Sequence, residues 1–183
     1  MSILKDYLKK AIDGEFSATQ KYTEFADIAQ NEGFSNIAYL FKALTAAENI
    51  HIKNHTNALK EEYQPEVEEF TRGTTIENVK DAMEAEFWES KTMYKNYLKE
   101  IKKDKKNPLL KVAQLSFEWA RDVEYTHYQA LKLALKYIEK GKDLDYSEIY
   151  VCKVCGDIIF TKPTEICPIC GHDPAFYFKV KRN

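Results

Sequence analysis

The segment Leu44-Thr-Ala-Ala-Glu-Asn-Ile-His51 decides the fold, because it places two ionisable side chains in an apolar helix stripe. The preceding stripe recurs at three- and four-residue steps, through Ile37, Phe41 and Leu44. That period is typical of an amphipathic helix. Glu48 and His51 then stand where further apolar side chains are expected, and residues three apart lie on the same helix face. The segment therefore predicts a helix that directs a carboxylate and an imidazole toward a core.

Three other stretches of the chain repeat this pattern. Their apolar stripes span residues 4–29, 79–101 and 110–138. Each stripe is interrupted by ionisable residues: the first by Glu15, the next by Glu86 and Glu89, and the last by Glu124 and His127. Four amphipathic helices predict a mainly α protein built as a four-helix bundle. Every helix of that bundle carries an acid where an apolar residue is expected.

Chain arithmetic predicts that these residues meet at one height. Polar breaks at residues 31–33 and 104–108 make each helix pair antiparallel, and a longer connection at 63–75 permits a crossover between the pairs. Glu15 lies 18 residues before Gly33 and Glu48 lies 15 after it. Glu86 lies 21 residues before Asn107 and Glu124 lies 17 after it. At about 1.5 Å per residue, each pair falls within roughly 6 Å of the same height.

Five carboxylates and two imidazoles in a core require protonation or counter-cations, because burying a charge costs several kcal/mol. A single Glu-x-x-His on a helix is more often a solvated pair than a ligand set. Here Glu48-x-x-His51 and Glu124-x-x-His127 are joined by single acids, Glu15 and Glu86. That combination is the di-iron carboxylate pattern of ferritin-like bundles. Two iron ions are the simplest source of the missing positive charge.

All four cysteines lie near the C-terminus, as Cys152-x2-Cys155-Gly and Cys167-x2-Cys170-Gly. A segment of this size rarely folds alone without a metal, a disulfide or a partner. Two-residue spacing suits chelation by four thiolates better than a structural disulfide. We therefore expect a bundle over residues 1–140, a linker over 141–149, and a metal-binding domain over 150–183.

Composition narrows the class of protein. The 183 residues carry 27 Lys and Arg against 29 Asp and Glu, a net charge of −2, which gives no indication of a nucleic-acid partner. No stretch approaches the roughly 18 apolar residues that span a membrane, and the N-terminus lacks the apolar core of a secretory signal. A cytoplasmic protein without a membrane partner is the expectation.

The residues quoted above resemble the rubrerythrin family over essentially the whole chain. The matching motifs are Gly14-Glu15 with Tyr22, Glu48-x-x-His51, Glu86-x-x-Glu89 with Met93-Tyr94, Glu124-x-x-His127, and the two terminal cysteine motifs. The resemblance implies a ferritin-like bundle with an oxo-bridged di-iron site and a small rubredoxin-like domain that holds one iron. It also implies reduction of hydrogen peroxide to water in protection against oxidative stress.

The resemblance further implies a role for each ligand. Glu48 and Glu124 would bridge the two irons, and Glu15, Glu86 and His127 would be terminal ligands. Glu89 would exchange with His51 at one iron when the site is reduced. Electrons would come from a rubredoxin or an NAD(P)H-dependent reductase through the iron held by Cys152, Cys155, Cys167 and Cys170.

A homodimer is also expected from the family. If the small domain lies beyond the end of its own bundle, a head-to-tail pair would bring it to the partner's di-iron site. The chain departs from many relatives at Ile158-Ile159-Phe160 and at the lysine that follows Tyr94, and neither departure touches a ligand.

For three side chains near the ligands, the sequence fits either a role at the site or simple packing. Tyr22 and Tyr94 can reach the site as hydrogen-bond donors to ligands, although an inward tyrosine is more often packing. His55 lies one turn past His51 and is more simply a satisfied core or surface histidine than an outer group of the site.

Two alternatives to a peroxidase stay open from the sequence. Ferritin-like oxidation and storage of iron would use the same bundle ligands, but it needs no cysteine-bound electron relay. A helical binding module with a structural zinc ribbon would account for the cysteines alone, because four-cysteine spacing does not separate zinc from iron.

Overall fold

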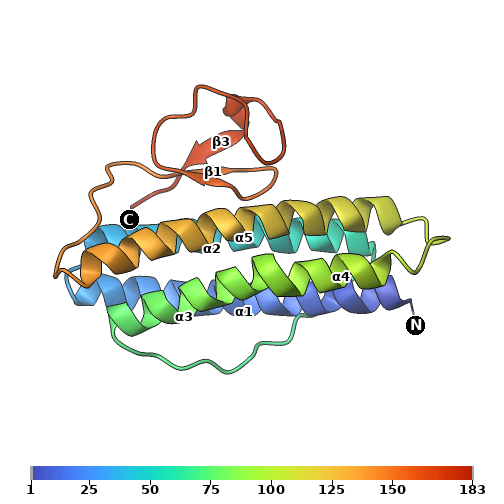
Figure 1. The fold of residues 1–183 in the computed structure, drawn as a ribbon, viewed down its shortest axis with the longest axis horizontal. Helices are drawn as coiled ribbons and strands as arrows, with labels where there is room; N and C mark the ends of the chain where they lie inside the picture. The colour runs from blue at the N-terminus through green and yellow to red at the C-terminus, as the bar shows by residue number, and fades with distance from the viewer. Residues whose placement is uncertain (1, 183) are drawn as a thin grey trace.

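The computed structural model describes residues 2–182 as a bundle of long helices with a small sheet packed on its side (Figure 1). The helices are α1 (Ile3–Asn31), α2 (Ser35–Leu59), α3 (Thr75–Trp88), the π-helix η1 (Glu89–Met93), α4 (Tyr94–Ile101) and α5 (Leu110–Ile138). Because α3, η1 and α4 follow one another without a break, they form one rod of the bundle. The predicted mainly α fold with four helical rods is confirmed.

Local sequence signals explain where these helices begin and end. Gly33, with φ of +90°, permits the tight turn that reverses the chain after α1. The Asp143 carboxylate accepts hydrogen bonds from the backbone N–H groups of Asn36 and Ile37, and so caps α2 from the distant linker. Thr74 and Glu77 form a capping box at the start of α3.

The third rod differs from a regular α-helix at η1. Its π-turn is closed by a hydrogen bond from the Tyr94 N–H to the Glu89 carbonyl, five residues earlier. One extra residue per turn rotates the following helix, so that Tyr94 and Leu98 are buried. Tyr97 is half-buried and packs against the same apolar cluster as Tyr94 and Leu98.

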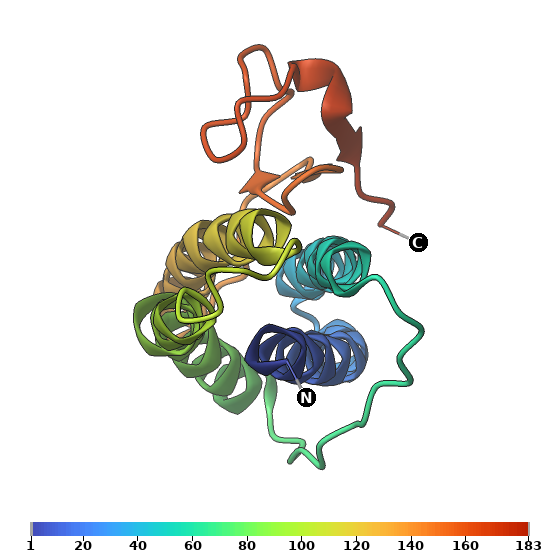
Figure 2. The same ribbon diagram turned by 90° about the vertical axis from the view of Figure 1, so that its right-hand side faces the viewer.

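Residues 60–74 form the long crossover between the two helix pairs and run along α1 (Figure 2). The Tyr63 hydroxyl donates to Asp13, which also accepts from the Glu66 N–H at 2.9 Å. The Glu68 N–H donates to the Ser17 hydroxyl at 3.0 Å. These bonds hold the crossover against α1.

The C-terminal segment forms a three-stranded antiparallel sheet in the order β2-β1-β3. The strands are β1 (Tyr150–Cys152), β2 (Ile158–Ile159) and β3 (Tyr177–Lys179), with a short 3-10 helix, η2 (Pro174–Phe176), before β3. Cys152 pairs with Tyr177, and Val151 pairs with Ile158 and with Phe178. This sheet is too small to bury an independent core, which agrees with the need for an anchor.

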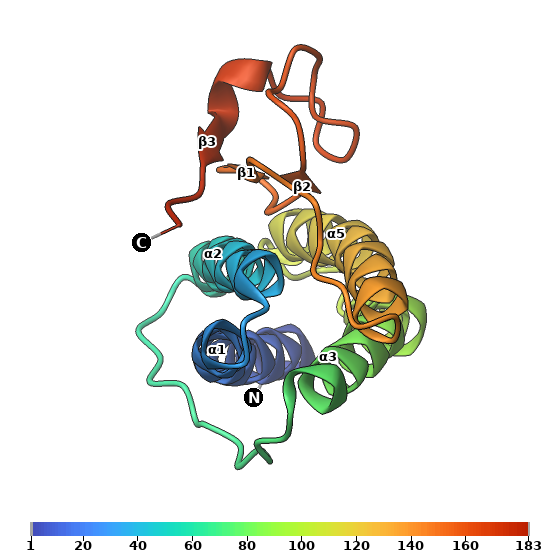
Figure 3. The same cartoon turned by 90° about the vertical axis from the view of Figure 1, so that its left-hand side faces the viewer.

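The small domain lies alongside α2 and α5, and not beyond an end of the bundle (Figure 3). The Tyr39 hydroxyl on α2 donates to the Val180 carbonyl at 2.8 Å and accepts from the Ile149 N–H at 3.1 Å. On α5, Val123 packs with three of the four cysteines and with Tyr177. The small domain therefore does not lie beyond the end of its own bundle, which was the condition under which a partner chain would be needed.

The bundle core consists of two apolar clusters. One, around Leu4, Leu8 and Phe117, fills the end near the N-terminus of α1. The other, around Phe25, Phe41 and Leu131, fills the opposite end and continues under the small sheet. The ionisable residues of the four rods lie between the two clusters. Among the residues that the structure describes, no helix has the length and apolar character needed to cross a membrane.

Candidate metal centres

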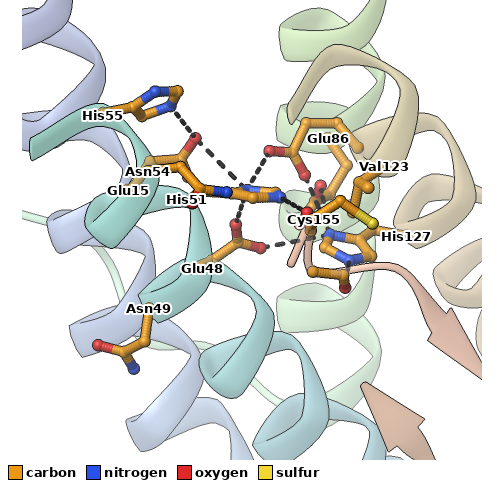
Figure 4. A network of polar contacts seen from close by, with 12 residues as sticks. Glu15, Glu48, Asn49, His51, Asn54, His55, Glu86, Val123, His127 and Cys155 are labelled. Carbon is orange, nitrogen blue, oxygen red and sulfur yellow. Dashed lines mark hydrogen bonds and ion pairs between the residues drawn. The ribbon is translucent and has the colours of Figure 1, made fainter. Parts of the chain in front are cut away.

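Six ionisable side chains from four rods meet in the middle of the bundle (Figure 4). They are Glu15 from α1, Glu48 and His51 from α2, Glu86 from α3, and Glu124 and His127 from α5. None of them is more than 1% exposed. The predicted register therefore brings together six of the seven residues proposed as bundle ligands, and the seventh, Glu89, lies outside the cluster.

The six residues form two overlapping groups of four, each with donor atoms within 4.8 Å of one another. One group contains Glu15 and His51, the other contains Glu86 and His127, and both contain Glu48 and Glu124. The Nδ1 atom of His51 lies 2.8 Å from Glu48 Oε2 and 2.9 Å from Glu124 Oε1. Two carboxylates shared between two donor sets provide the arrangement that a pair of metal ions needs.

Whether a pair of metal ions fits this cluster can be judged from its buried polar atoms that lack hydrogen-bond partners. Buried atoms without an aligned hydrogen-bond partner include both carboxylate oxygens of Glu48 and Glu124, and the Nδ1 atoms of both histidines. One oxygen each of Glu15 and Glu86 is in the same condition. Buried polar atoms that converge without hydrogen-bond geometry are costly unless a cation binds them. Carboxylates and imidazoles are also donors that suit iron, so the residues fit.

Without a cation, the charges in this cluster shift one another's pKa values. Burial, reinforced by Glu48, raises the pKa of Glu15 and Glu124. Burial acts to lower the pKa of His51, but the Glu48 carboxylate outweighs it and raises that pKa to about 9. The cluster therefore holds protons in place of the cations that a loaded site would hold.

Glu89, at the start of the π-helix, is half-buried and lines a cavity of about 320 Å³. The cavity lies between the first and third rods, and its other lining residues include Gly14, Lys21, Tyr22 and Trp88. Glu89 thus lines the cavity, whereas His51 belongs to the cluster itself. In this structure His51, and not Glu89, completes the first group of donors.

Two buried tyrosines donate hydrogen bonds to carboxylates of the cluster. The Tyr22 hydroxyl donates to Glu86 Oε1 at 2.7 Å, and the Tyr94 hydroxyl donates to Glu15 Oε1. Burial and the neighbouring carboxylates raise the pKa of both phenols, so both keep their protons. Both tyrosines therefore contact ligand candidates and are not solely packing residues.

The four cysteines form a second centre. Their sulfur atoms all lie within 4.8 Å of one another, with Cys155 Sγ 3.5 Å from Cys167 Sγ and Cys152 Sγ 3.7 Å from Cys170 Sγ. None of them forms a disulfide. Metal–sulfur bonds of about 2.3 Å in a tetrahedron place the sulfurs roughly 3.8 Å apart, so these separations fit one tetrahedral ion.

The two loops that carry these cysteines have the same local structure. The Gly156 N–H donates to the Cys152 carbonyl, and the Gly171 N–H donates to the Cys167 carbonyl, each at 2.9 Å. Both glycines have positive φ, of +91° and +72°. The Cys-x-x-Cys-Gly pattern thus accounts for both turns, because positive φ is readily adopted only by glycine.

The two centres touch through the backbone of the first cysteine loop. His51 Nε2 lies 3.0 Å from the Cys155 carbonyl oxygen, and His127 Nε2 lies 3.4 Å from the Gly156 carbonyl oxygen. Only an Nε2–H can donate to a carbonyl, so when these imidazoles are neutral, as metal ligation requires, each would present its Nδ1 lone pair to the carboxylate cluster. A Cβ atom on Gly156 would lie 2.8 Å from His51 Nε2, so the glycine permits this approach.

Comparison with known proteins agrees with this architecture. The rubrerythrin family model matches residues 6–135, which is most of the bundle. This chain belongs to the rubrerythrin family. It is 34% identical to rubrerythrin-2 of Clostridium acetobutylicum over 170 residues, which are 91% of this chain and 90% of that protein.

Nigerythrin is a second relative in sequence and in structure. Nigerythrin of Nitratidesulfovibrio vulgaris is 32% identical, with 89% of this chain and 79% of that protein covered. A solved structure of nigerythrin in a mixed-valent state superposes with a TM-score of 0.85 at 27% identity, and covers 98% of this chain and 86% of that one. A fully reduced, all-ferrous nigerythrin superposes equally well, with 87% of that chain covered.

Family membership and geometry together define the two centres. The bundle carries the rubrerythrin-type di-iron carboxylate and histidine site, and the four cysteines form the rubredoxin-like iron site. The family consists of oxidoreductases related to the di-iron proteins of oxidative stress. The predicted family, fold and cofactors are confirmed.

Two buried polar residues near these centres were not among the predicted site residues. Asp157, only 2% exposed, accepts from the Tyr177 hydroxyl at 2.6 Å and lies 3.9 Å from Cys167 Sγ. His55 is fully buried between Ser116 and Tyr94. The one signal for His55 was its spacing of four residues from His51, on the same helix face, and Asp157 gave no signal.

Proposed function

We propose that this rubrerythrin is a non-haem di-iron peroxidase that reduces hydrogen peroxide to water with electrons relayed through its four-cysteine iron. The observation that carries the proposal is the direct contact between the two donor sets, made by Cys155 and His51. The overall reaction consumes one peroxide, two electrons and two protons and yields two water molecules. When bound, a ferrous pair supplies both electrons together.

The geometry supports a specific role for each bundle ligand. Glu48 and Glu124 belong to both donor groups, so they are the residues to bridge two metals. Glu15 and Glu86 belong to one group each and are terminal ligands. His127 completes the second group, and His51 completes the first.

Glu89 is the residue that we propose to exchange with His51 when the oxidation state changes. An anionic carboxylate suits ferric iron, and a neutral imidazole suits ferrous iron. The structure has His51 in the donor cluster and Glu89 at the cavity, which is the arrangement proposed for the reduced state. Replacing His51 with alanine and finding unchanged peroxide turnover would remove this part of the proposal.

The cavity beside Glu89 suits a small polar substrate. Its lining includes the polar residues Lys21, Tyr22 and Glu89 together with the apolar Phe70. Such groups can hydrogen-bond a peroxide, and the volume of about 320 Å³ accommodates it without displacement of a helix. Trp88, which is 53% exposed, also lines this cavity.

The contact between the centres supports the electron relay. Cys155 contributes both a thiolate to the four-cysteine site and a carbonyl that accepts from His51. One residue of the small domain thus touches a ligand of each centre, and the whole contact lies within one chain. Homodimerisation and an external donor such as rubredoxin or an NAD(P)H-dependent reductase stay predictions from the family.

A single-turnover measurement on the full chain tests the proposal. Anaerobic protein with about three ferrous ions is mixed with one equivalent of hydrogen peroxide, and the iron oxidation state is followed by absorption. We expect one peroxide to oxidise two irons, no iron to leave the protein, and the four-cysteine iron to return one electron to the bundle afterwards.

The ferritin-like alternative predicts a different result in the same experiment. Added ferrous iron would be oxidised and would accumulate well beyond two ions per bundle. Progressive accumulation of ferric iron without catalytic consumption of peroxide would contradict the peroxidase proposal.

A further inference from the structure

Among the residues that the structure describes, the hydrogen-bonded row Ser116, His55, Tyr94 and Glu15 has no counterpart on the Glu86 side of the bundle site. His55 Nδ1 lies 2.7 Å from Ser116 Oγ, and His55 Nε2 lies 2.9 Å from the Tyr94 hydroxyl oxygen. That hydroxyl in turn contacts Glu15 Oε1. His55 is fully buried and Ser116 is 5% exposed, so water does not replace these bonds.

The positions of the protons in this row follow from one condition. As a metal ligand Glu15 is ionised and can only accept, so the single hydroxyl hydrogen of Tyr94 is committed to Glu15. Tyr94 must therefore accept from His55, which requires hydrogen on Nε2 of His55. Its Nδ1 atom is then bare and accepts from the Ser116 hydroxyl. Every hydrogen bond in the row thus has one direction.

Other features of the site agree with a neutral His55. Both ring nitrogens of His55 are hydrogen-bonded to hydroxyl groups, a set of partners that an imidazole with one N–H and one bare nitrogen satisfies. The Phe117 ring packs against His55 edge-on, with centroids 5.2 Å apart, and contributes no polar group. The only carboxylate oxygen within 4 Å of His55 among the described residues is Glu15 Oε1, at 3.8 Å from Nε2.

We propose that His55, oriented by Ser116, is a positioning residue that fixes the Tyr94 hydroxyl on Glu15 and so sets the orientation of this metal ligand. The Tyr22 hydroxyl donates to Glu86 without any such support, because among the described residues it has no hydrogen-bond partner other than Glu86. The row therefore makes the Glu15 side of the site stiffer than the Glu86 side. The inference rests on Glu15 being a ligand, as the proposed function requires, but not on peroxide chemistry.

The first test determines the tautomer of His55 directly. The full chain is loaded with Zn²⁺ in both centres, which keeps it diamagnetic, and the imidazole nitrogens are observed by long-range ¹H–¹⁵N NMR. We expect His55 to carry hydrogen on Nε2 and none on Nδ1. Hydrogen on Nδ1, or on both nitrogens, would overturn the proposal.

The second test is a double-mutant cycle on Zn²⁺ affinity at the bundle, measured by chelator competition after the cysteine site is saturated. His55→Leu is expected to weaken binding about tenfold in the parent protein and less than about twofold in Tyr94→Phe, because His55 acts through Tyr94. Ser116→Ala should give a smaller loss in the same direction, and His55→Gln, which keeps an N–H donor, should recover part of the affinity.

Thr45→Val is the control, because the Thr45 hydroxyl bonds only to the Phe41 carbonyl in its own helix. An equal loss for His55→Leu in both backgrounds would show a general packing role and overturn the proposal. Because Zn²⁺ performs no redox chemistry, these results are the same whether or not the protein reduces peroxide. A peroxidase failure would instead appear as absent turnover beside an unchanged cycle.

Discussion

The bundle centre and the cysteine centre differ in how much of the surrounding fold is stabilised without the metal. The bundle centre sits between two large apolar clusters, so its rods are held together with or without a metal. The cysteine centre is held by a sheet whose longest strands have three residues, and three of its four cysteines are themselves its buried core. A metal therefore completes a fold that exists in the bundle, whereas it supports the fold in the small domain.

The centres also differ in how their donors are arranged along the chain. The cysteine ligands come from two loops of one short segment. The bundle ligands come from four rods and depend on the register of long helices, with buried carboxylates that repel one another when no cation is present. The buried carboxylates therefore destabilise the metal-free bundle, and a bound metal offsets that destabilisation.

Removal of a shared bundle ligand should have the largest effect. Glu48→Ala takes a donor from both metal groups, so we expect the iron content to fall from about three ions per chain to about one, with the cysteine iron retained. Peroxide turnover should drop at least about 100-fold. Glu84→Ala, an exposed acid on α3, is the control and should retain three ions. Retention of two bundle irons in Glu48→Ala would contradict the shared-ligand assignment.

Removal of a cysteine should separate the two centres. Cys167→Ala is expected to lose the cysteine iron and the hydrogen-exchange protection of β1–β3, while the bundle helices keep theirs. Steady-state peroxide consumption should fall about 100-fold, and oxidation of a chemically pre-reduced bundle should not change. Ile166→Ala, at a position 65% exposed, serves as the control. Equal loss of protection in the sheet and the bundle would disprove the claim that only the small domain depends on its metal to stay folded.

Metal removal should make the bundle sensitive to pH. In the metal-free chain the pKa values of Glu15, Glu124, His51 and His127 are raised, so the folded state binds more protons than the unfolded state. Stability is then present at low pH and lost as the pH rises, by up to about 1.4 kcal/mol per pH unit for each titrating group. Glu48, with a lowered pKa, opposes this only in the acid range. His55, whose pKa is lowered to about 3, opposes it below the unfolded value of 6.5, where the raised pKa values of Glu15 and Glu124 outweigh one histidine.

Urea unfolding followed by far-ultraviolet circular dichroism at pH 5.5, 6.5 and 7.5 measures this dependence. The free energy of unfolding of the metal-free chain should decrease across the series, and that of the iron-loaded chain should not. A metal-free chain whose stability is constant or rises over this range would contradict the account of buried, proton-holding ligands.

Loss of a hydrogen bond to a ligand should have the smallest effect. Tyr22→Phe removes the donor to Glu86 without changing the volume of the ring, and we expect peroxide turnover to fall about tenfold with all three irons present. Tyr125→Phe is the matched control, because Tyr125 is 37% exposed and stacks on Tyr128 away from the ligands. Equal activity of the two variants would assign Tyr22 to packing.

Much of the fold was predictable because its signals are local. The spacing of Glu48 from His51, and of Glu124 from His127, places each pair on one helix face whatever the tertiary structure. The distance of each ligand from a short loop then fixes its height, because helices have a constant rise. From these regularities alone, the sequence predicts that the six bundle ligands lie close together.

The remainder depends on contacts between distant residues. The partner of His55 is Ser116, 61 residues away, and the partner of His51 Nε2 is the Cys155 carbonyl, 104 residues away. No periodicity encodes such pairs. The π-turn after Glu89 was missed for a different reason, since one additional residue in a helix leaves the composition and the approximate period unchanged.

The contact between the centres is the central claim, and two glycines test it most directly. Gly156 and Gly171 occupy the same place after their Cys-x-x-Cys pairs, and both have positive φ. A Cβ atom added to Gly156 would lie 2.8 Å from His51 Nε2. A Cβ atom added to Gly171 would have no other atom within 4 Å. Gly156→Ala and Gly171→Ala therefore impose similar backbone strain, but only the first disturbs the contact.

The measurement is the rate at which the reduced cysteine iron re-reduces the peroxide-oxidised bundle, by stopped-flow absorption in variants that each hold about three irons. The account predicts that Gly156→Ala slows this step at least about tenfold relative to Gly171→Ala, with unchanged oxidation of the bundle by peroxide. Equal rates of re-reduction in the two variants would contradict it.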